Sequence, residues 1–181
     1  MWNNLRLFLW MTFLTGILYP LLITIVAQLA VKEKADGGLI SLHGHIAGAQ
    51  LIGQKFESAR YFWGRPSAID YKPLPSGATN FGPTSSALKK IVQERRQKLA
   101  KSHNVEEGKV PAELLFASGS GLDPHISLAA AYFQTGRIAA ERGIDRQKVK
   151  ELVDQLAIKR TWGFLGEPCV NVLLLNIFLE K

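Results

Sequence analysis

The sequence of 181 residues has little sulfur and, in its first 32 positions, no acidic side chain. Its only cysteine is Cys169, which excludes a disulfide scaffold and a cysteine-based zinc module. Hydrophobic residues make up 47% of the chain and charged residues 20%, which excludes an intrinsically disordered protein. The length leaves room for one ordinary domain.

Charge is missing above all from residues 7–31, where 19 of 25 positions are apolar. Arg6 is the only charged side chain before Lys32. A helix that rises about 1.5 Å per residue would extend this segment to roughly 37 Å, more than the ~30 Å of a hydrocarbon core. We therefore predict a transmembrane anchor at residues 7–31, preceded by a short cytoplasmic tail at residues 1–6.

A cleaved signal peptide is the main alternative to a permanent anchor, because Arg6 precedes the apolar run. The run is longer than the roughly 7 to 15 residues of a signal h-region, and residues 26–30 offer no good small-x-small cleavage site. Charge counting does not decide the orientation, since Lys32 and Lys34 follow the run. A short tail before a long apolar run is typical of an uncleaved signal anchor, which would place residues 32–181 outside the cytoplasm.

Five non-apolar residues recur every four positions along the anchor, and we call them the anchor ridge: Thr12, Gly16, Pro20, Thr24 and Gln28. In lipid, small residues permit close approach of two helices and polar side chains hydrogen-bond between them. The ridge therefore predicts a contact with a partner helix, and Pro20 also predicts a kink. The alternative is that threonine and glycine are common in lone anchors and that the spacing arises by chance.

The remaining residues, 32–181, carry a net charge of +6. We predict a linker at residues 32–46 and an extracytoplasmic domain at residues 47–181. Glycine and proline punctuate residues 64–86, so this stretch is expected to be an irregular loop of the kind that carries function. The expected strands are 51–52, 61–63 and 170–174. The expected helices are one capped by Ser85 or Ser86 that runs to about Ser102, one at 111–116, one capped by Ser127 that ends near Arg142 with Gly143 as its stop, and a last one capped by Asp145.

Interleaved short strands and helices after one transmembrane helix define the predicted fold class as α+β, with a single mixed domain. The basic side chains of residues 85–102 scatter around the helix circumference instead of forming one stripe. They are better interpreted as a solvated helix face, and no nucleic-acid partner is predicted.

Signals for catalysis or metal binding are weak. The chain has no Gly-x-x-x-x-Gly-Lys-Ser/Thr phosphate loop, and residues 118–121 lack the strand-turn-helix context of a nucleophile elbow. His43 and His45 have no carboxylate or thiol nearby, so no metal site is predicted. Asp123 precedes a proline, and its carboxylate is expected to accept backbone N–H groups of the next segment.

We predict no catalytic residue. An anchored enzyme acting on envelope material, using Ser120, Asp123 and His125, remains an alternative. A freestanding anchored binding protein is a second one.

Several stretches together carry a family resemblance: residues 50–54 (Gln-Leu-Ile-Gly-Gln), 61–67 (Tyr-Phe-Trp-Gly-Arg-Pro-Ser), 118–127 (Ser-Gly-Ser-Gly-Leu-Asp-Pro-His-Ile-Ser) and 166–172 (Gly-Glu-Pro-Cys-Val-Asn-Val), with Leu175 and Asn176. In this order and spacing they resemble the C subunit of the bacterial Kdp potassium-transporting ATPase. Residues 76–80 depart from the family's Ser-Gly-Gly-Ser-Asn, because Ala78 replaces a glycine. Alanine would be strained if that position required a positive φ.

The resemblance implies a complex in the bacterial cytoplasmic (inner) membrane. It would contain a potassium-channel-like A subunit, a P-type ATPase B subunit, a small F peptide and the C subunit, and it would take up K⁺ at the expense of ATP. Members of the family are described as single-span proteins with the N-terminus inside and the C-terminal domain outside. They are needed for assembly, and they are also proposed to act as catalytic chaperones that raise the ATP affinity of the B subunit.

Direct ATP binding conflicts with this topology, because residues 32–181 would lie outside and contain no phosphate-binding motif. We therefore expect a non-catalytic accessory subunit that holds no cofactor, with its anchor ridge on partner helices and its domain on the pore subunit. The resemblance implies the following partner contacts in the outer domain: Tyr61, Phe62, Trp63, Arg65, Pro66, Asn80, Ser118, Gly119, Ser120, Gly121, Asp123, His125, Glu167 and Asn171.

Overall fold

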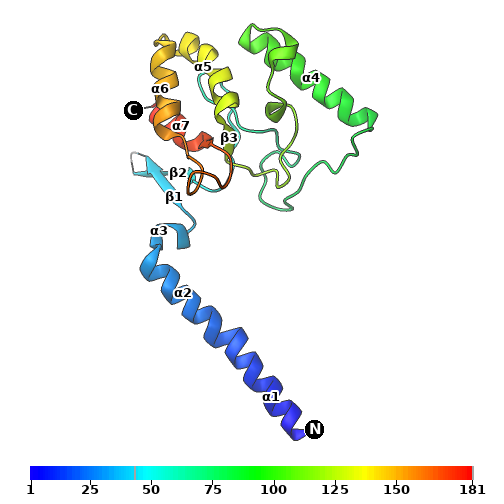
Figure 1. Ribbon diagram of the computed structural model, residues 1–181, viewed down its shortest axis with the longest axis vertical. Coiled ribbons are helices and arrows are strands. Elements are labelled where there is room, and N and C mark those ends of the chain that lie inside the picture. The colour runs from blue at the N-terminus through cyan, green and yellow to red at the C-terminus, as the bar shows by residue number, and fades with distance from the viewer. Residues whose placement is uncertain (43, 181) are drawn as a thin grey trace. The chain divides into compact units, whose positions relative to one another are not determined.

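The computed structural model describes residues 1–42 and 44–180 and divides into two compact units, Met1–Ala49 and Gln50–Lys181. Figure 1 shows a long helix in the first unit, and helices with short strands in the second. The predicted α+β class with one N-terminal helix able to span a membrane is confirmed. His43, considered above as a metal ligand, lies outside the described residues.

The first unit begins with one uninterrupted helix of 29 residues, made of α1 (Trp2–Phe13), the π-helical turn η1 (Leu14–Leu18) and α2 (Tyr19–Ala30). Its mean hydropathy of 2.0 and its length suffice to cross a membrane, as predicted. The helix starts at Trp2 and not at Leu7, because no proline or glycine occurs at residues 2–6. Most of the predicted tail is therefore part of α1.

A π-helical turn lies directly before Pro20, where the sequence predicts an irregularity. Pro20 has no N–H, so the carbonyl of Gly16 lacks its usual partner four residues further on. Within the turn, the N–H of Tyr19 donates to the carbonyl of Leu14, five residues back. The helix is therefore widened locally in the middle of the anchor ridge.

The predicted linker at residues 32–46 contains regular secondary structure. It contains α3 (Lys32–Ala35), β1 (Leu39–Leu42) and the start of β2 (His45–Ala49), and the two strands pair antiparallel. Gly37 and Gly38, at φ +88° and +60°, follow α3, and Gly44 at φ +81° lies between the strands. Glycine adopts this left-handed conformation without strain, so the chain can end α3 at Gly37 and Gly38 and reverse its direction between the two strands at Gly44.

The second unit contains α4 (Ser86–His103), the 3₁₀ turns η2 (Glu107–Lys109) and η3 (Ala112–Leu114), β3 (His125–Ser127), α5 (Leu128–Arg142), α6 (Arg146–Leu156), β4 (Cys169–Asn171) and α7 (Val172–Phe178). β3 and β4 form a two-stranded antiparallel sheet with Ile126 opposite Val170. In Figure 1, α5, α6 and α7 gather near this sheet and α4 lies to one side. The core between them includes Phe62, Leu115, Ile126, Ile138, Val149, Val153, Val170 and Leu175, all at most 1% exposed.

The predicted helix caps are confirmed. Ser85 accepts from Leu88 N–H at the start of α4, and Ser127 accepts from Ala130 N–H at the start of α5. Asp145 accepts from the N–H of Gln147 in the same way for α6, and α5 ends at Gly143 with φ +65°. Each of the three side-chain caps acts between residues at most three apart, which is why the sequence alone predicts them.

The predicted strands are only partly correct. Residues 51–52 and 61–63 form no strand, and residues 64–85 are irregular as expected. The expected strand 170–174 ends at Asn171, whose side chain accepts from the N–H of Leu174 and so starts α7. This asparagine cap outweighs the strand propensity of the apolar run that follows it.

Candidate functional site

The aromatic stretch Tyr61–Trp63 is held by side-chain amides where a strand would use a neighbouring strand. Asn176 on α7 accepts from Phe62 N–H at 2.7 Å and donates to Phe62 O at 3.0 Å. Gln134 on α5 pairs with the backbone of Trp63 in the same way, at 2.8 and 3.0 Å. Each amide satisfies both backbone groups of one residue, as a strand partner would do. The stretch is thus fixed by residues far away in the sequence.

The guanidinium of Arg137 on α5 joins this stretch to the core. Arg137 is 7% exposed, donates to the carbonyls of Ala59 and Tyr61, and lies 3.9 Å from the centroid of the Trp63 ring. Its Nε donates to Nε2 of His103 at 3.1 Å. No carboxylate of the described residues forms an ion pair with it. Burial lowers the pKa of Arg137 to about 10, so it stays charged at neutral pH.

The imidazole of His103 fits this network only in its neutral form. Its Nδ1 lies 2.9 Å from the carbonyl of Leu99, so Nδ1 carries the proton and Nε2 accepts from Arg137. The ring stacks on Phe133, with 4.4 Å between the centroids. Burial, with a further contribution from the charge of Arg137, lowers the pKa of His103 to about 4.

Folding stability is expected to fall as the pH drops from 6.5 towards 4, because unfolded His103 then binds a proton that the folded form excludes. The contribution is fully present above pH 6.5, and its loss amounts to about 2 kcal/mol. Denaturant unfolding of the full chain in detergent, measured between pH 4 and 7.5, gives the change in the free energy of unfolding with pH. The glutamine in His103→Gln cannot titrate, so the free energy of unfolding of this variant should change less with pH in this window. An equal change in both proteins would contradict the neutral state assigned to His103.

The turn at residues 118–121 is hydrogen-bonded to the irregular loop at two points. The N–H of Ser118 donates to the carbonyl of Pro66 at 3.0 Å. The carbonyl of Ser120 accepts from the N–H of Gly77 at 3.1 Å. The turn is therefore bonded to the irregular loop near its start, at Pro66, and in its middle, at Gly77.

Asp123 links the same turn to the aromatic stretch. Its Oδ2 accepts from Nη1 of Arg65 at 3.1 Å, and its Oδ1 accepts from the N–H of His125 at 3.0 Å, as expected of an aspartate before proline. Oγ of Ser120 accepts from the N–H of Leu122 at 3.1 Å. No hydrogen bond between Ser120 and His125 is found among the described residues, so these side chains do not form a nucleophile-base pair.

Four of the residues expected to contact partners are buried: Phe62, Ser118, Gly121 and Asn171. In the isolated chain these side chains position their neighbours, and their contact with a partner stays a prediction. Asn171, for example, donates to the carbonyl of Gln50 at 2.7 Å. Asn80, Gly119, Ser120 and Glu167 are exposed, and Tyr61, Trp63, Arg65, Pro66, Asp123 and His125 are partly exposed.

The strain considered for Ala78 does not arise, because Ala78 is not among the non-glycine residues at positive φ. Asn80, two positions later, has φ +54°. Asparagine tolerates this left-handed conformation better than most residues. The loop therefore accommodates alanine at the position where the family has glycine.

Two groups of residues escape the sequence reasoning. Gln134 and Arg137 are polar residues that lie among the apolar positions of a predicted helix. This mismatch with the apolar pattern is the one sequence signal that could reveal them. Trp162 and Phe164 lie at the tip of a hairpin closed by the pairing of Thr161 with Leu165, and they are 81% and 68% exposed. A glycine between two aromatic residues is the signal for this turn. We call Trp162, Phe164 and Leu165 the hairpin tip.

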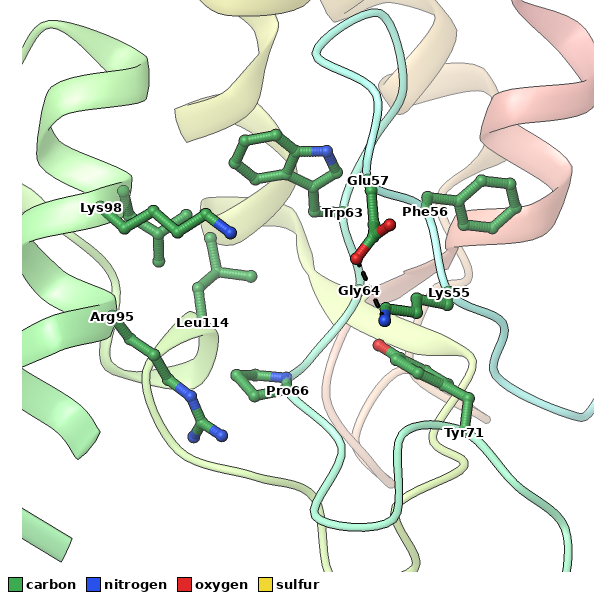
Figure 2. Close-up of a pocket in the computed structure, with 11 residues that line it drawn as sticks. Lys55, Phe56, Glu57, Trp63, Gly64, Pro66, Tyr71, Arg95, Lys98 and Leu114 are labelled. Carbon is green, nitrogen blue, oxygen red and sulfur yellow. Dashed lines mark ion pairs between the residues drawn. The ribbon is translucent and has the colours of Figure 1, made fainter.

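The second unit also contains a groove between α4 and residues 55–71, with a volume of about 270 Å³. Figure 2 shows Arg95 and Lys98 on the α4 side of this groove, and Trp63 and Tyr71 among the residues opposite them. Burial raises the pKa of Tyr71 to about 12, and its hydroxyl donates to the carbonyl of Arg65 at 2.5 Å. We call this the α4 groove.

The anchor ridge is exposed over its whole length in the isolated chain. The hydroxyl of Thr24 donates to the carbonyl of Pro20 in its own helix at 2.8 Å, and Gln28 donates to Asp36 at 3.0 Å. A Cβ added at Gly16 would meet only the methyl group of Thr12, at 4.0 Å. Gly16 is thus the ridge position most open to another helix.

The fold and the site together define the class of protein. It is an α+β protein with one candidate N-terminal membrane span, and its polar signature residues mainly form hydrogen bonds that hold the loops of the same chain together. The chain belongs to the family described as K⁺-transporting ATPase, c chain, whose model matches residues 1–181. This confirms the resemblance found in the sequence.

Curated relatives cover nearly the whole chain. The potassium-transporting ATPase KdpC subunit of Herpetosiphon aurantiacus is 45% identical over 171 residues, which are 93% of this chain and 89% of the relative. The KdpC subunits of Methylococcus capsulatus and Sorangium cellulosum are each 45% identical over 179 residues, 97% of this chain and 94% of the relative.

Proposed function

We propose that the chain is a non-catalytic accessory subunit of a potassium-transporting ATPase complex. The N-terminus would lie in the cytoplasm, the helix Trp2–Ala30 in the cytoplasmic membrane and residues 50–181 outside. Family membership, the names of the relatives and the single candidate span support this proposal. The partners would be the channel-like A subunit, the ATPase B subunit and the F peptide.

The proposal of a structural role rests on one observation: the polar signature residues form hydrogen bonds within the chain. The side-chain amides of Asn171 and Asn176 donate hydrogen bonds to the backbone of other loops, and the carboxylate of Asp123 accepts from Arg65 and from a backbone N–H. Polar groups that are already hydrogen-bonded inside the chain are not free to act on a substrate. The same bonds give the loops a fixed shape, which a docking surface requires.

Two surfaces remain for assembly. The anchor ridge would pack on helices of the pore or ATPase subunit, with Gly16 at the closest approach. In the second unit, the exposed Asn80 and Glu167 and the hairpin tip would dock on the outer face of the pore subunit. Exposed aromatic side chains such as Trp162 are typical anchors of protein interfaces.

ATP and K⁺ would be handled by the other subunits. In the described residues we find no glycine-rich loop leading into a helix N-terminus, the usual cradle for phosphates. Any effect of the chain on the ATP affinity of the B subunit would then pass through subunit contacts. A chaperone that itself binds ATP is the competing proposal, and saturable ATP binding by the isolated chain would favour it.

Gly16→Leu is expected to lower the amount of chain that copurifies with the A and B subunits about tenfold, because an isobutyl group keeps the partner helix away from the ridge. The measurement is the subunit ratio of the detergent-solubilised complex, with the total amount of chain in the membrane determined in parallel.

Thr15→Leu is the matched control, since it adds similar bulk about a quarter turn around the helix and should leave the ratio unchanged. Unchanged assembly with Gly16→Leu would remove the ridge from the proposal. Absence of the wild-type chain from the purified complex would refute the accessory function and favour a freestanding binding protein.

A further inference from the structure

The α4 groove combines apolar walls with uncompensated positive charge. Trp63, Leu99 and Leu114 supply apolar surface, and Figure 2 shows the side chains of Arg95 and Lys98 projecting from α4 towards it. A groove of this kind suits a ligand that has both an apolar part and an anionic end.

The charges in the groove do not cancel. Lys55 is paired with Glu57 at 3.1 Å and with Asp70 at 2.8 Å, so this cation is compensated. Arg95 and Lys98 form no ion pair with any acidic residue of the described chain. The groove therefore presents two cations that have no anion of their own.

Arg95 is oriented for one particular kind of partner. Its Nη1 donates to the carbonyl of Leu115 at 2.8 Å, which fixes the plane of the guanidinium. Its Nε and Nη2 lie side by side along the other edge, and neither forms a hydrogen bond with the residues that the structure describes. Two parallel N–H donors on one edge match the two oxygens of a carboxylate.

We propose that the α4 groove binds an acidic segment of another subunit of the complex, with a carboxylate on Arg95 and Lys98 and its aliphatic stem against Trp63 and Leu114. This inference rests on the accessory function proposed above. Residues 50–181 carry a net charge of +6, so an acidic partner surface is also complementary over a longer range.

A carboxylate suits the groove better than a polyphosphate does. Residues 95–99 belong to the C-terminal half of α4, so the groove does not receive the N–H groups and positive dipole of a helix N-terminus. Two cations balance one or two carboxylates, whereas a chain of phosphates would leave negative charge unpaired among apolar side chains.

Carbodiimide cross-linking of the purified complex tests the proposal, because this reagent joins an amine to a carboxylate only where the two are in contact. We expect Lys98 to form an amide with an Asp or Glu of a partner subunit, identified by mass spectrometry. Acetylation of Lys98 should be about 10-fold slower in the complex than in the full chain purified alone. Lys101, exposed on the same helix outside the groove, is the control and should react equally in both.

Lys98→Glu provides a second measurement. The side chain is exposed and forms no hydrogen bond or ion pair within the described part of the chain, so the variant should fold, and copurification with the partners should decrease about 10-fold. Lys101→Glu should leave it unchanged.

Equal acetylation of Lys98 in the intact complex and in the separate chain would overturn the proposal while leaving the accessory function in place. Protection that requires inorganic phosphate or ATP, and not the partner subunits, would show that the groove binds a small anion and would equally overturn it. A chain that does not copurify at all would refute the accessory function instead.

Discussion

Arg137→Ala is expected to lower the free energy of unfolding of the full chain by about 3–5 kcal/mol. The substitution removes the donors for the carbonyls of Ala59 and Tyr61 and leaves both without their partner. It also opens a cavity next to Trp63, whose ring stacks on the guanidinium. Denaturant unfolding in detergent, followed by tryptophan fluorescence, measures the loss.

Arg160→Ala is the matched control, because Arg160 is exposed and its side chain bonds to no residue among 1–42 and 44–180; its effect should stay within about 0.5 kcal/mol. Arg137→Lys should restore little, since an ammonium group cannot reach several acceptors with the fixed fork of a guanidinium. A loss below about 1 kcal/mol for Arg137→Ala would show that Asn176 and Gln134 hold the aromatic stretch without it.

Gly121→Ala is the substitution with the second largest expected effect, a loss of about 2–4 kcal/mol. Gly121 has φ +71°, which an alanine adopts only under strain. The added Cβ would lie 2.6 Å from Cγ1 of Ile69 and 2.9 Å from the carbonyl oxygen of Gly77. The contact with backbone cannot be relieved by a rotamer change, so the turn at residues 118–121 must move.

Gly119→Ala is the control within the same turn. No atom lies within 4 Å of the Cβ position of Gly119, and its φ is outside the left-handed region. We expect an effect within about 0.5 kcal/mol, or a slight gain from the reduced entropy of the unfolded chain. Equal effects of the two substitutions on thermal unfolding would contradict the role assigned to Gly121.

A large part of the fold follows from local sequence. The candidate membrane span is visible because charge is absent over a stretch longer than a bilayer is thick, and this needs no knowledge of the rest of the chain. The caps Ser85, Ser127 and Asp145 were predictable for the same reason, since each acts on an N–H at most three residues away.

The incorrect strand predictions show where local signals stop. Tyr61–Trp63 has the composition of a strand, yet its hydrogen-bond partners are the side chains of Gln134 and Asn176. Nothing near the stretch reveals that these amides replace a neighbouring strand. Asn171 ends the strand β4, and its side-chain Oδ1 accepts from Leu174 N–H, so a helix begins where the apolar run predicts more strand.

The candidate site divides in the same way. Signature residues identified the family, but only burial separates those that build the interior, such as Phe62 and Ser118, from those that face outward, such as Glu167. The hairpin tip and the α4 groove were not predicted, because each combines residues whose exposure depends on the packing of other elements.

The sequence by itself determined the candidate membrane span, the starts of α4, α5 and α6, and the family, because hydropathy, capping and signature order are properties of neighbouring residues. Only the tertiary structure decided which polar groups form hydrogen bonds inside the chain and which stay exposed and available to a partner. That division depends on distances between residues up to 121 positions apart, as in the bond from Asn171 to Gln50, and only the folded chain brings such residues together.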